Sequence, residues 1–185
     1  MPVWFPKGYT PQAAGGSDQY LNFKTPGKYY FRVLEGPLIG FEYWQKGTGT
    51  QKDKPVRSKI METPINPVTR PNGMPDSPKE FYAFKVFAYD DNTRKSGKVK
   101  VLSVTTATIK NAIYNYMDNP DFPTVDKYDF VLERVGTQLD TQYNLTRLDS
   151  SPLPKFAVEA EGTTFVNLEA LYTGGDPFSA QELFA

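Results

Sequence analysis

The sequence predicts an all-β domain with one helix, and three observations support this fold class. Five stretches rich in aromatic and β-branched residues show the alternation of strands and are bounded by Gly, Pro, Asn or Asp. Only one stretch repeats its apolar residues at helical spacing. With 185 residues and 39% hydrophobic content, the chain can bury a core and form one domain with an appendage, or at most two small domains.

The first strand is expected over residues 28–35, KYYFRVLE, and it continues past a Gly-Pro kink through residues 38–45. Strand alternation places Tyr30 and Arg32 on the same face of this strand. An aromatic ring and a cation therefore lie next to each other on the first strand.

Residues 46–78 follow, and no regular structure is expected there. The segment holds six Pro and three Gly, and it carries six basic residues against three acidic ones. A loop of this length is either functional or a solvated insertion. Its basic excess favours a functional role.

Residues 79–90, KEFYAFKVFAYD, are expected to form the central strand. One face of this strand is an ordinary apolar row. The other face combines three rings with a cation: Phe81, Lys85, Phe87 and Tyr89. Two interpretations stay open. This face offers its rings to a ligand, such as stacked bases with their phosphates, or the strand lies inside a sandwich with both faces buried.

The remaining elements are a strand, a helix and two more strands, expected over residues 98–104, 105–118, 127–135 and 141–148. Lys98 and Lys100 share one face of the first of these strands. The order strand, strand, strand, helix, strand, strand is that of an OB-fold, a small barrel that binds oligonucleotides or oligosaccharides. We therefore expect a five-stranded OB-fold barrel in which residues 46–78 are a long inserted loop.

Composition divides the chain into three parts: an irregular N-terminal arm over residues 1–24, the OB-fold domain over 25–155, and an acidic segment with a flexible tail over 156–185. All 21 basic residues lie at or before Lys155, whereas five of the 21 acidic residues follow it. Residues 1–155 therefore carry a net charge of +5 and the remainder −5. This asymmetry indicates a polyanionic partner and a segment that competes with it or recruits other proteins.

Two absent residue types narrow the chemistry. The chain has no Cys and no His, which removes thiol nucleophiles, the Ser-His-Asp arrangement and the usual zinc ligands. We expect no catalytic residue, no metal and no cofactor. A metal-dependent nuclease using Asp90, Asp91 or Asp129 is a rival interpretation, but adjacent carboxylates at a strand end point apart.

No stretch has the length of a membrane helix or the features of a signal peptide, so an intracellular protein is expected.

The interleaving of rings and cations predicts an interface for single-stranded nucleic acid. Stacking on an aromatic ring contributes about 1–3 kcal/mol per base with little regard to sequence, and Lys or Arg side chains contact the phosphates. The candidate residues are Tyr30, Arg32, Tyr43, Trp44, Arg57, Lys59, Phe81, Lys85, Phe87, Tyr89, Lys98 and Lys100.

Several stretches of the chain also carry a family resemblance. They are FRVL (31–34), YW (43–44), KPVRS (54–58), KEFYAFKVFAYD (79–90), KVKVLSVTTATIKNAIYNYM (98–117) and YDFVLERVGTQLDTQYNLT (128–146). In this order, over about residues 28–154, the chain resembles the single-stranded DNA-binding proteins of tailed bacteriophages. The resemblance implies an OB-fold protein that coats single strands in phage DNA replication, recombination and repair, in the cytoplasm of an infected bacterial host.

The resemblance also bears on single residues. The family's aromatic and basic positions correspond to Arg32, Trp44, Arg57, Phe84, Tyr89 and Tyr143. Tyr143 thereby joins the candidate site, while Phe84 falls on the apolar row of its strand and is left out. Some members of the family hold the inserted loop together with zinc, which this chain cannot do without Cys or His.

The end of the chain, TGGDPFSAQELFA from residue 173, combines acidic and apolar residues after a Gly-Gly joint. In the family that the chain resembles, such a tail docks replication or recombination proteins. The expected partner-binding residues are Asp176, Phe178, Glu182 and Phe184. An OB-fold module for carbohydrate or protein remains an alternative; it would use the same rings without cations, and the basic excess of residues 46–78 argues against it.

Overall fold

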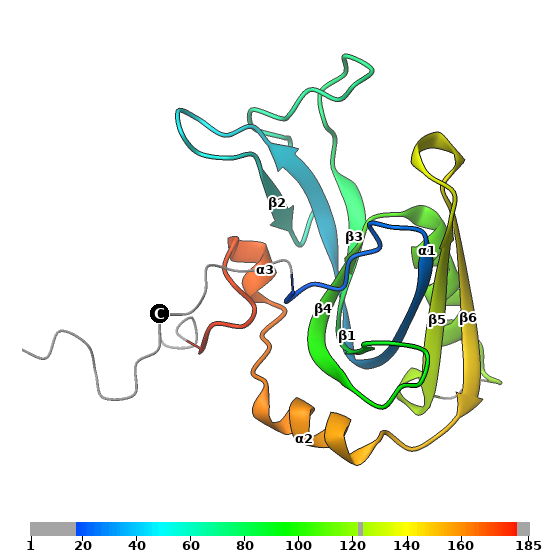
Figure 1. Cartoon of the computed structure of the whole chain (residues 1–185). Helices are drawn as coiled ribbons and strands as arrows, with labels where there is room; N and C mark the ends of the chain where they lie inside the picture. Colours follow the sequence, from blue (N-terminus) through cyan, green and yellow to red (C-terminus); the bar gives the residue numbers. More distant parts are fainter. Residues whose placement is uncertain (1–17, 122–123, 181–185) are drawn as a thin grey trace, which may run out of the picture.

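The computed structural model describes residues 18–121 and 124–180. In this part of the chain, six antiparallel strands form one sheet and three α-helices accompany it (Figure 1). The strands are β1 (Gly27–Gln45), β2 (Lys54–Ser58), β3 (Lys79–Tyr89), β4 (Gly97–Val104), β5 (Tyr128–Val135) and β6 (Gln142–Ser150). The α-helices are α1 (Ala107–Asp118), α2 (Lys155–Thr163) and α3 (Ala170–Thr173), and two short 3-10 turns cover Val125–Lys127 and Gln138–Asp140.

The mostly β class is confirmed, but the expected count of five strands and one helix is wrong. The additional strand, β2, lies in the segment expected to be irregular, and the additional helices lie in the acidic C-terminal segment. The expected kink in the first strand is confirmed within β1, where the pairing register with β3 shifts between Val33 and Leu38. Gly36 is required there, because its φ is +122° and a Cβ would lie 2.9 Å from the carbonyl oxygen of Ala83.

The sheet runs in the order β4-β3-β1-β5-β6, and β2 pairs with the far end of β1. Helix α1 covers the inner face of this curved sheet. Apolar side chains that alternate along the strands meet Ile109 and Ile113 of α1 there. They are Phe31, Val33, Phe84, Val86, Leu102, Val104, Phe130, Leu132 and Leu145.

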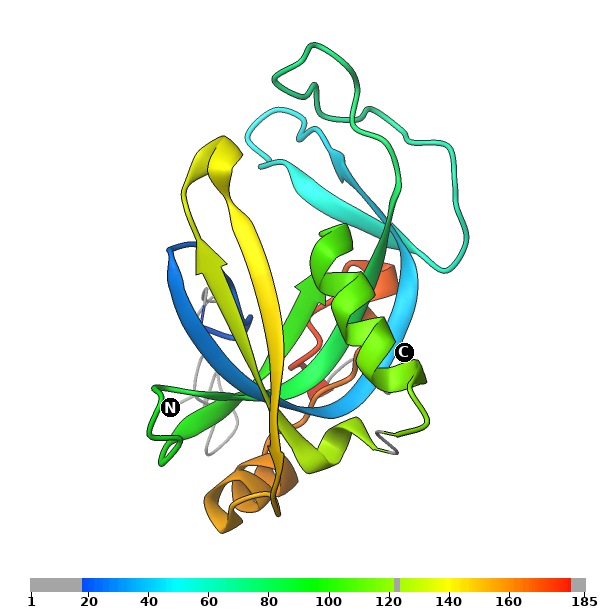
Figure 2. The ribbon, with the colours of Figure 1, turned by 90° about the vertical axis from the view of Figure 1, so that its right-hand side faces the viewer.

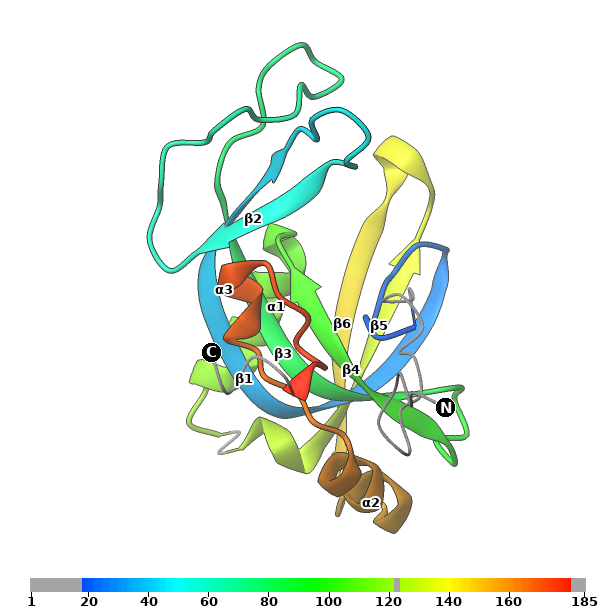
Figure 3. The ribbon, with the colours of Figure 1, turned by 90° about the vertical axis from the view of Figure 1, so that its left-hand side faces the viewer.

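The C-terminal segment covers the opposite face of β3, where Figure 3 shows α3 in front of the sheet and α1 behind it. We call residues 155–180 the C-terminal cover. Leu168 and Leu171 of the cover are buried against Phe81 of β3, and Ala157 is buried against Phe87. The described part of the acidic segment therefore has helices and packs on the sheet, neither of which was expected from the sequence. Both faces of the central strand are buried, as the second interpretation expected, but the C-terminal cover and not a second sheet lies on its outer face.

Residues 41–78 form a projecting lobe that we call the arm, with β2 and the end of β1 at its centre (Figure 2). The chain after β2 returns along the other edge of β1, where the backbone N–H of Val68 donates to the carbonyl of Trp44. The buried Asp76 accepts a hydrogen bond from the Trp44 N–H at 2.7 Å and pairs with Arg70 at 2.7 Å. The inserted segment thus has more structure than expected, which corrects the prediction of an irregular loop.

The described residues before β1, which belong to the segment expected to be irregular (1–24), lie against β4. Tyr20 forms a parallel bridge with Val101, and the N–H of Leu21 donates to the carbonyl of Val101. Among the described residues, none of the helices has the length and apolar character needed to cross a membrane.

Candidate nucleic-acid interface

The predicted aromatic face of β3 lies beneath the C-terminal cover. Phe81 and Phe87 have no exposed surface, and Tyr89 is 7% exposed. The ring of Phe87 lies 5.7 Å from that of Phe156, and the ring of Phe81 lies 6.3 Å from that of Tyr172. In this arrangement the rings contact protein, so they are not free to stack on bases.

Three predicted cations at this face are paired with carboxylates. Lys85 lies 3.5 Å from Glu161, and Lys59 lies 3.0 Å from Glu169. Arg57 is paired with Glu42 at 2.7 Å. Because Glu161 and Glu169 belong to the cover, its acidic side chains lie where the sequence predicts phosphates.

Lys98 and Lys100 lie on the opposite face of the sheet from Phe81, Lys85 and Phe87. Their cross-strand partners are Ala88 and Val86, which belong to the other row of β3. Both lysines pair with Asp18, at 2.7 Å and 2.9 Å. Hydrogen bonds from Lys98 and Lys100 lower the pKa of Asp18 to about 2.

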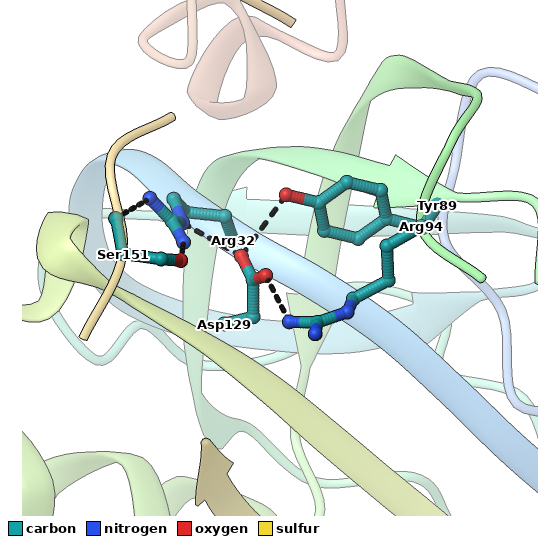
Figure 4. Close-up of polar contacts among 5 residues, drawn as sticks. All are labelled: Arg32, Tyr89, Arg94, Asp129 and Ser151. Atoms are coloured by element: carbon teal, nitrogen blue, oxygen red, sulfur yellow. Dashed lines mark hydrogen bonds and ion pairs between the residues drawn. The ribbon is translucent and has the colours of Figure 1, made fainter. Parts of the chain in front are cut away.

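Arg32 is also buried, within a polar network at one end of the sheet (Figure 4). Its Nε donates to Asp129 at 2.7 Å, and its two terminal nitrogens donate to the carbonyl and hydroxyl oxygens of Ser151. Arg94 and the hydroxyl of Tyr89 donate to the same carboxylate, at 2.7 Å and 3.0 Å. Burial and, secondly, the charge of Asp129 raise the pKa of Tyr89 to about 12. Arg32 and Tyr89 therefore hold the fold together in this structure.

The other predicted tyrosines are at least partly covered. Tyr43 is 7% exposed, and its hydroxyl oxygen accepts a hydrogen bond from the Ile65 N–H at 3.0 Å. Tyr30 packs against the cluster of Phe87 and its neighbours. Tyr143 packs beside the inner core and lines a cavity at the edge of the sheet.

Trp44 is the predicted ring that the structure leaves most open, with 45% of its surface exposed. It lies on the arm, where Lys46, Lys52 and Lys54 are exposed and form no ion pair with any described residue. These three lysines were not singled out from the sequence, although the basic excess of residues 46–78 indicated such cations. The arm is therefore where an exposed ring and unpaired cations occur together.

Of the four residues expected to bind partner proteins, Asp176 and Phe178 lie in the part of the chain that the structure describes. The backbone N–H of Phe178 donates to Asp176, and the Phe178 side chain packs against the cluster around Phe81 and Leu171. Glu182 and Phe184 lie outside the described residues. The described beginning of the expected tail is thus part of the cover.

The acidic residues considered for a nuclease have other contacts. Asp129 is held by Arg32 and Arg94, and Asp91 accepts hydrogen bonds from the backbone and hydroxyl of Thr93. Within residues 18–121 and 124–180, no three acidic side chains gather as metal ligands would.

Comparisons with known proteins assign neither a family nor a function to this chain. The chain matches no protein-family model, and no match to it is found among curated proteins or solved structures. A function for this chain has to be argued from its own residues.

Replacing Phe87 with Ala is expected to lower the free energy of unfolding by about 3–5 kcal/mol, because a fully buried ring is removed from between β3 and α2. Trp44→Ala removes a half-exposed ring and is expected to cost about 1 kcal/mol or less. Chemical denaturation of both variants measures the difference. Equal losses would contradict the burial of β3 beneath the cover.

Asp129→Asn is expected to cost about 3–5 kcal/mol, because it leaves the Arg32 guanidinium buried without a counter-charge. Asp126→Asn is the matched control, since Asp126 lies three residues earlier and is exposed. Urea denaturation curves of the two variants provide the comparison. A loss for Asp129→Asn no larger than that of the control would show that the network contributes little.

Proposed function

We propose that this protein binds single-stranded DNA without sequence preference and coats it during phage DNA replication, recombination and repair. The observation that carries the proposal is the half-exposed Trp44 on an arm with three exposed lysines that form no ion pair with a described residue. A planar ring accepts any base, and nearby cations follow the phosphate backbone. The protein acts without catalysis in this proposal, inside the infected bacterial cell.

The order of the elements supports an OB-fold as the finer description of the sheet. β1 is long enough to pair with β3 over one stretch and with β5 over another, as the first strand of such a barrel must. Helix α1 lies between the third and fourth strands of this barrel order when β2 is counted as part of the insertion. In OB-folds the loop after the first strand, which corresponds to the arm, is one of those that bind oligonucleotides.

The charges of the arm support contact with phosphates. Lys46 follows Trp44 by two residues, whereas Lys54 lies opposite Gln45 and therefore starts from the other face of the strand pair. Each lysine that contacts a phosphate releases condensed counterions, so affinity gained in this way falls as salt rises. The arm thus combines a sequence-tolerant contact with an electrostatic one.

In this proposal, the C-terminal cover competes with the DNA strand for cations at the outer face of β3. Glu169 pairs with Lys59 at a site where both side chains are more than half exposed. Exposed pairs of this kind contribute about 0–1 kcal/mol, so a phosphate can replace the carboxylate at little cost. Residues near the end of the chain, including Asp176 and Phe178, are proposed to bind replication or recombination proteins.

A protein-binding module is the second candidate, and one observation favours it. The arm exposes four large apolar side chains to between 61% and 71% of their surface: Ile60, Met61, Ile65 and Met74. Such side chains are suited to an apolar partner surface. A protein that uses the arm in this way would show no affinity for oligo-dT.

Oligo-dT is expected to quench the fluorescence of Trp44, measured in a Trp4→Phe background because the chain has two Trp residues. Affinity should fall steeply with salt and should be much weaker for duplex DNA, in which bases are already stacked. Equal affinity for duplex and single strand would contradict stacking on Trp44. The absence of quenching would favour the protein-binding alternative.

The contributions of ring and charge can be separated on the arm. Trp44→Ala should weaken oligo-dT binding without changing the salt slope, whereas Lys54→Gln should make the slope shallower by about one. Lys95→Gln is the matched control, because Lys95 is exposed in the β3–β4 turn and away from the arm. A slope reduced equally by both lysine variants would indicate a general charge effect.

Glu169→Gln is expected to raise the affinity for oligo-dT a few-fold at low salt, because Lys59 then has no carboxylate partner. Glu159→Gln is the matched control, since it removes the same charge from an exposed position of α2 that forms no ion pair with a described residue. Fluorescence titration compares the two. An identical rise in both variants would show that only net charge matters.

A further inference from the structure

A cavity of about 420 Å³, broadly open to solvent, lies between the two end strands of the sheet, β4 and β6. Its walls come from four parts of the chain: the segment before β1, the junction of β4 and α1, the end of β5 and the start of β6. Polar and charged side chains contribute to these walls. Those used below are Lys24, Ser103, Thr105, Thr106, Arg134 and Tyr143.

The charge of this cavity is one-sided. Of the residues that the structure describes, Lys24 and Arg134 line it and no carboxylate does. Three other cavities each include an acidic residue in their walls: Glu35 in one, Asp90 in the second and Glu62 in the third. The cavity between β4 and β6 is therefore suited to an anion.

Arg134 gives a second reason to expect an anion in this cavity. Its terminal nitrogens donate to the carbonyl of Phe23 and to the hydroxyl of Thr141, the latter at 3.4 Å. Its Nε is buried and has no hydrogen-bond partner among the described residues. A buried donor without a partner is costly, and such groups in native proteins usually have a role. Nε itself is covered by protein, so an anion in the cavity would meet the terminal nitrogens of this guanidinium, each of which carries a second N–H.

The start of α1 faces the same space. Thr106 is the N-cap residue, but its side chain makes no capping hydrogen bond, and the first turn of the helix holds no acidic residue. The first backbone N–H groups of this 12-residue helix have no intrahelical acceptor, and the Thr106 side chain does not supply one. These donors and the helix dipole favour a negative charge at this end.

We propose that this cavity binds a phosphate group, held by Arg134, Lys24 and the backbone N–H groups at the start of α1. The hydroxyls of Ser103 and Thr105 are additional donors, and the ring of Tyr143 lies at the same wall. The expected source of the phosphate is the backbone of a bound single strand, and this part rests on the proposed function. Free phosphate has the same chemistry, so the experiment has an arm for each source.

The first arm is a ¹H–¹⁵N NMR titration of the full chain with inorganic phosphate, against chloride at equal ionic strength. The Arg134 Nε–H and the amides of residues 106–108 are expected to shift saturably with phosphate. Thr106→Asp is expected to abolish these shifts, because its carboxylate occupies the anion site. Asp is a favoured N-cap residue, so the melting temperature of this variant should be unchanged or higher.

Thr108→Asp is the matched control, because Thr108 lies in the same first turn, is exposed and does not line the cavity. It should keep the phosphate-dependent shifts of the wild-type chain. The proposal is overturned if phosphate shifts these signals no more than chloride does, or if Thr106→Asp and Thr108→Asp respond alike.

The second arm is a titration with oligo-dT at several salt concentrations. A salt slope shallower by about one in Thr106→Asp, with Thr108→Asp unchanged, assigns the phosphate to the strand. A slope equal in both variants, together with loss of the phosphate-dependent shifts, supports a site for free phosphate and overturns its assignment to the strand. A chain that binds no oligo-dT would contradict the proposed function, while the first arm still decides whether the cavity binds phosphate.

Discussion

The burial of β3 on both faces is the constraint on which the rest of this structure depends. Its inner row packs into the core beneath α1, and its outer row packs against α2 and α3. Burying one large apolar side chain contributes about 1.5–3 kcal/mol, and the cover adds Leu168 and Leu171 to this face. The cover is therefore part of the fold, held by apolar contact before any ion pair is counted. The rings and cations that remain open to a ligand therefore lie on the arm and at the edge between β4 and β6.

The buried pair of Arg32 and Asp129 decides where the cover begins. Arg32 lies on β1, Asp129 lies on the neighbouring β5, and the same guanidinium donates to both oxygens of Ser151. Ser151 follows β6 directly and precedes α2 by only a few residues. Because removal of the Asp129 carboxylate leaves the Arg32 guanidinium buried without a counter-charge, this anchor is costly to break. The chain is thus fixed at the point from which it crosses to the outer face of β3.

Local periodicity was sufficient to predict β1 with its kink, β3, β4, α1 and the last two strands. It was insufficient where a distant segment decides the outcome. The alternation in β3 places Phe81 and Phe87 on one face, but it contains no information about whether that face contacts a ligand or α3. Arg32 has its partner 97 residues away, so its burial leaves no local signal. Within the candidate site, Trp44 was predicted as a ring and is exposed, whereas the unpaired lysines of the arm were visible only as a compositional excess.

The net charge of zero is compatible with a polyanionic partner because the acidic residues are not all equivalent. At the outer face of β3, Lys85 is 13% exposed in its pair with Glu161, whereas Lys59 is 68% exposed in its pair with Glu169. Solvent already weakens the second pair, so exchange of its carboxylate for a phosphate changes the energy little. Replacement of the Glu161 carboxylate by a phosphate at Lys85 would require the cover to move and would expose the rings beneath it. In the proposed function, a DNA strand can therefore gain the charge of Lys59 together with that of the arm while β3 stays buried.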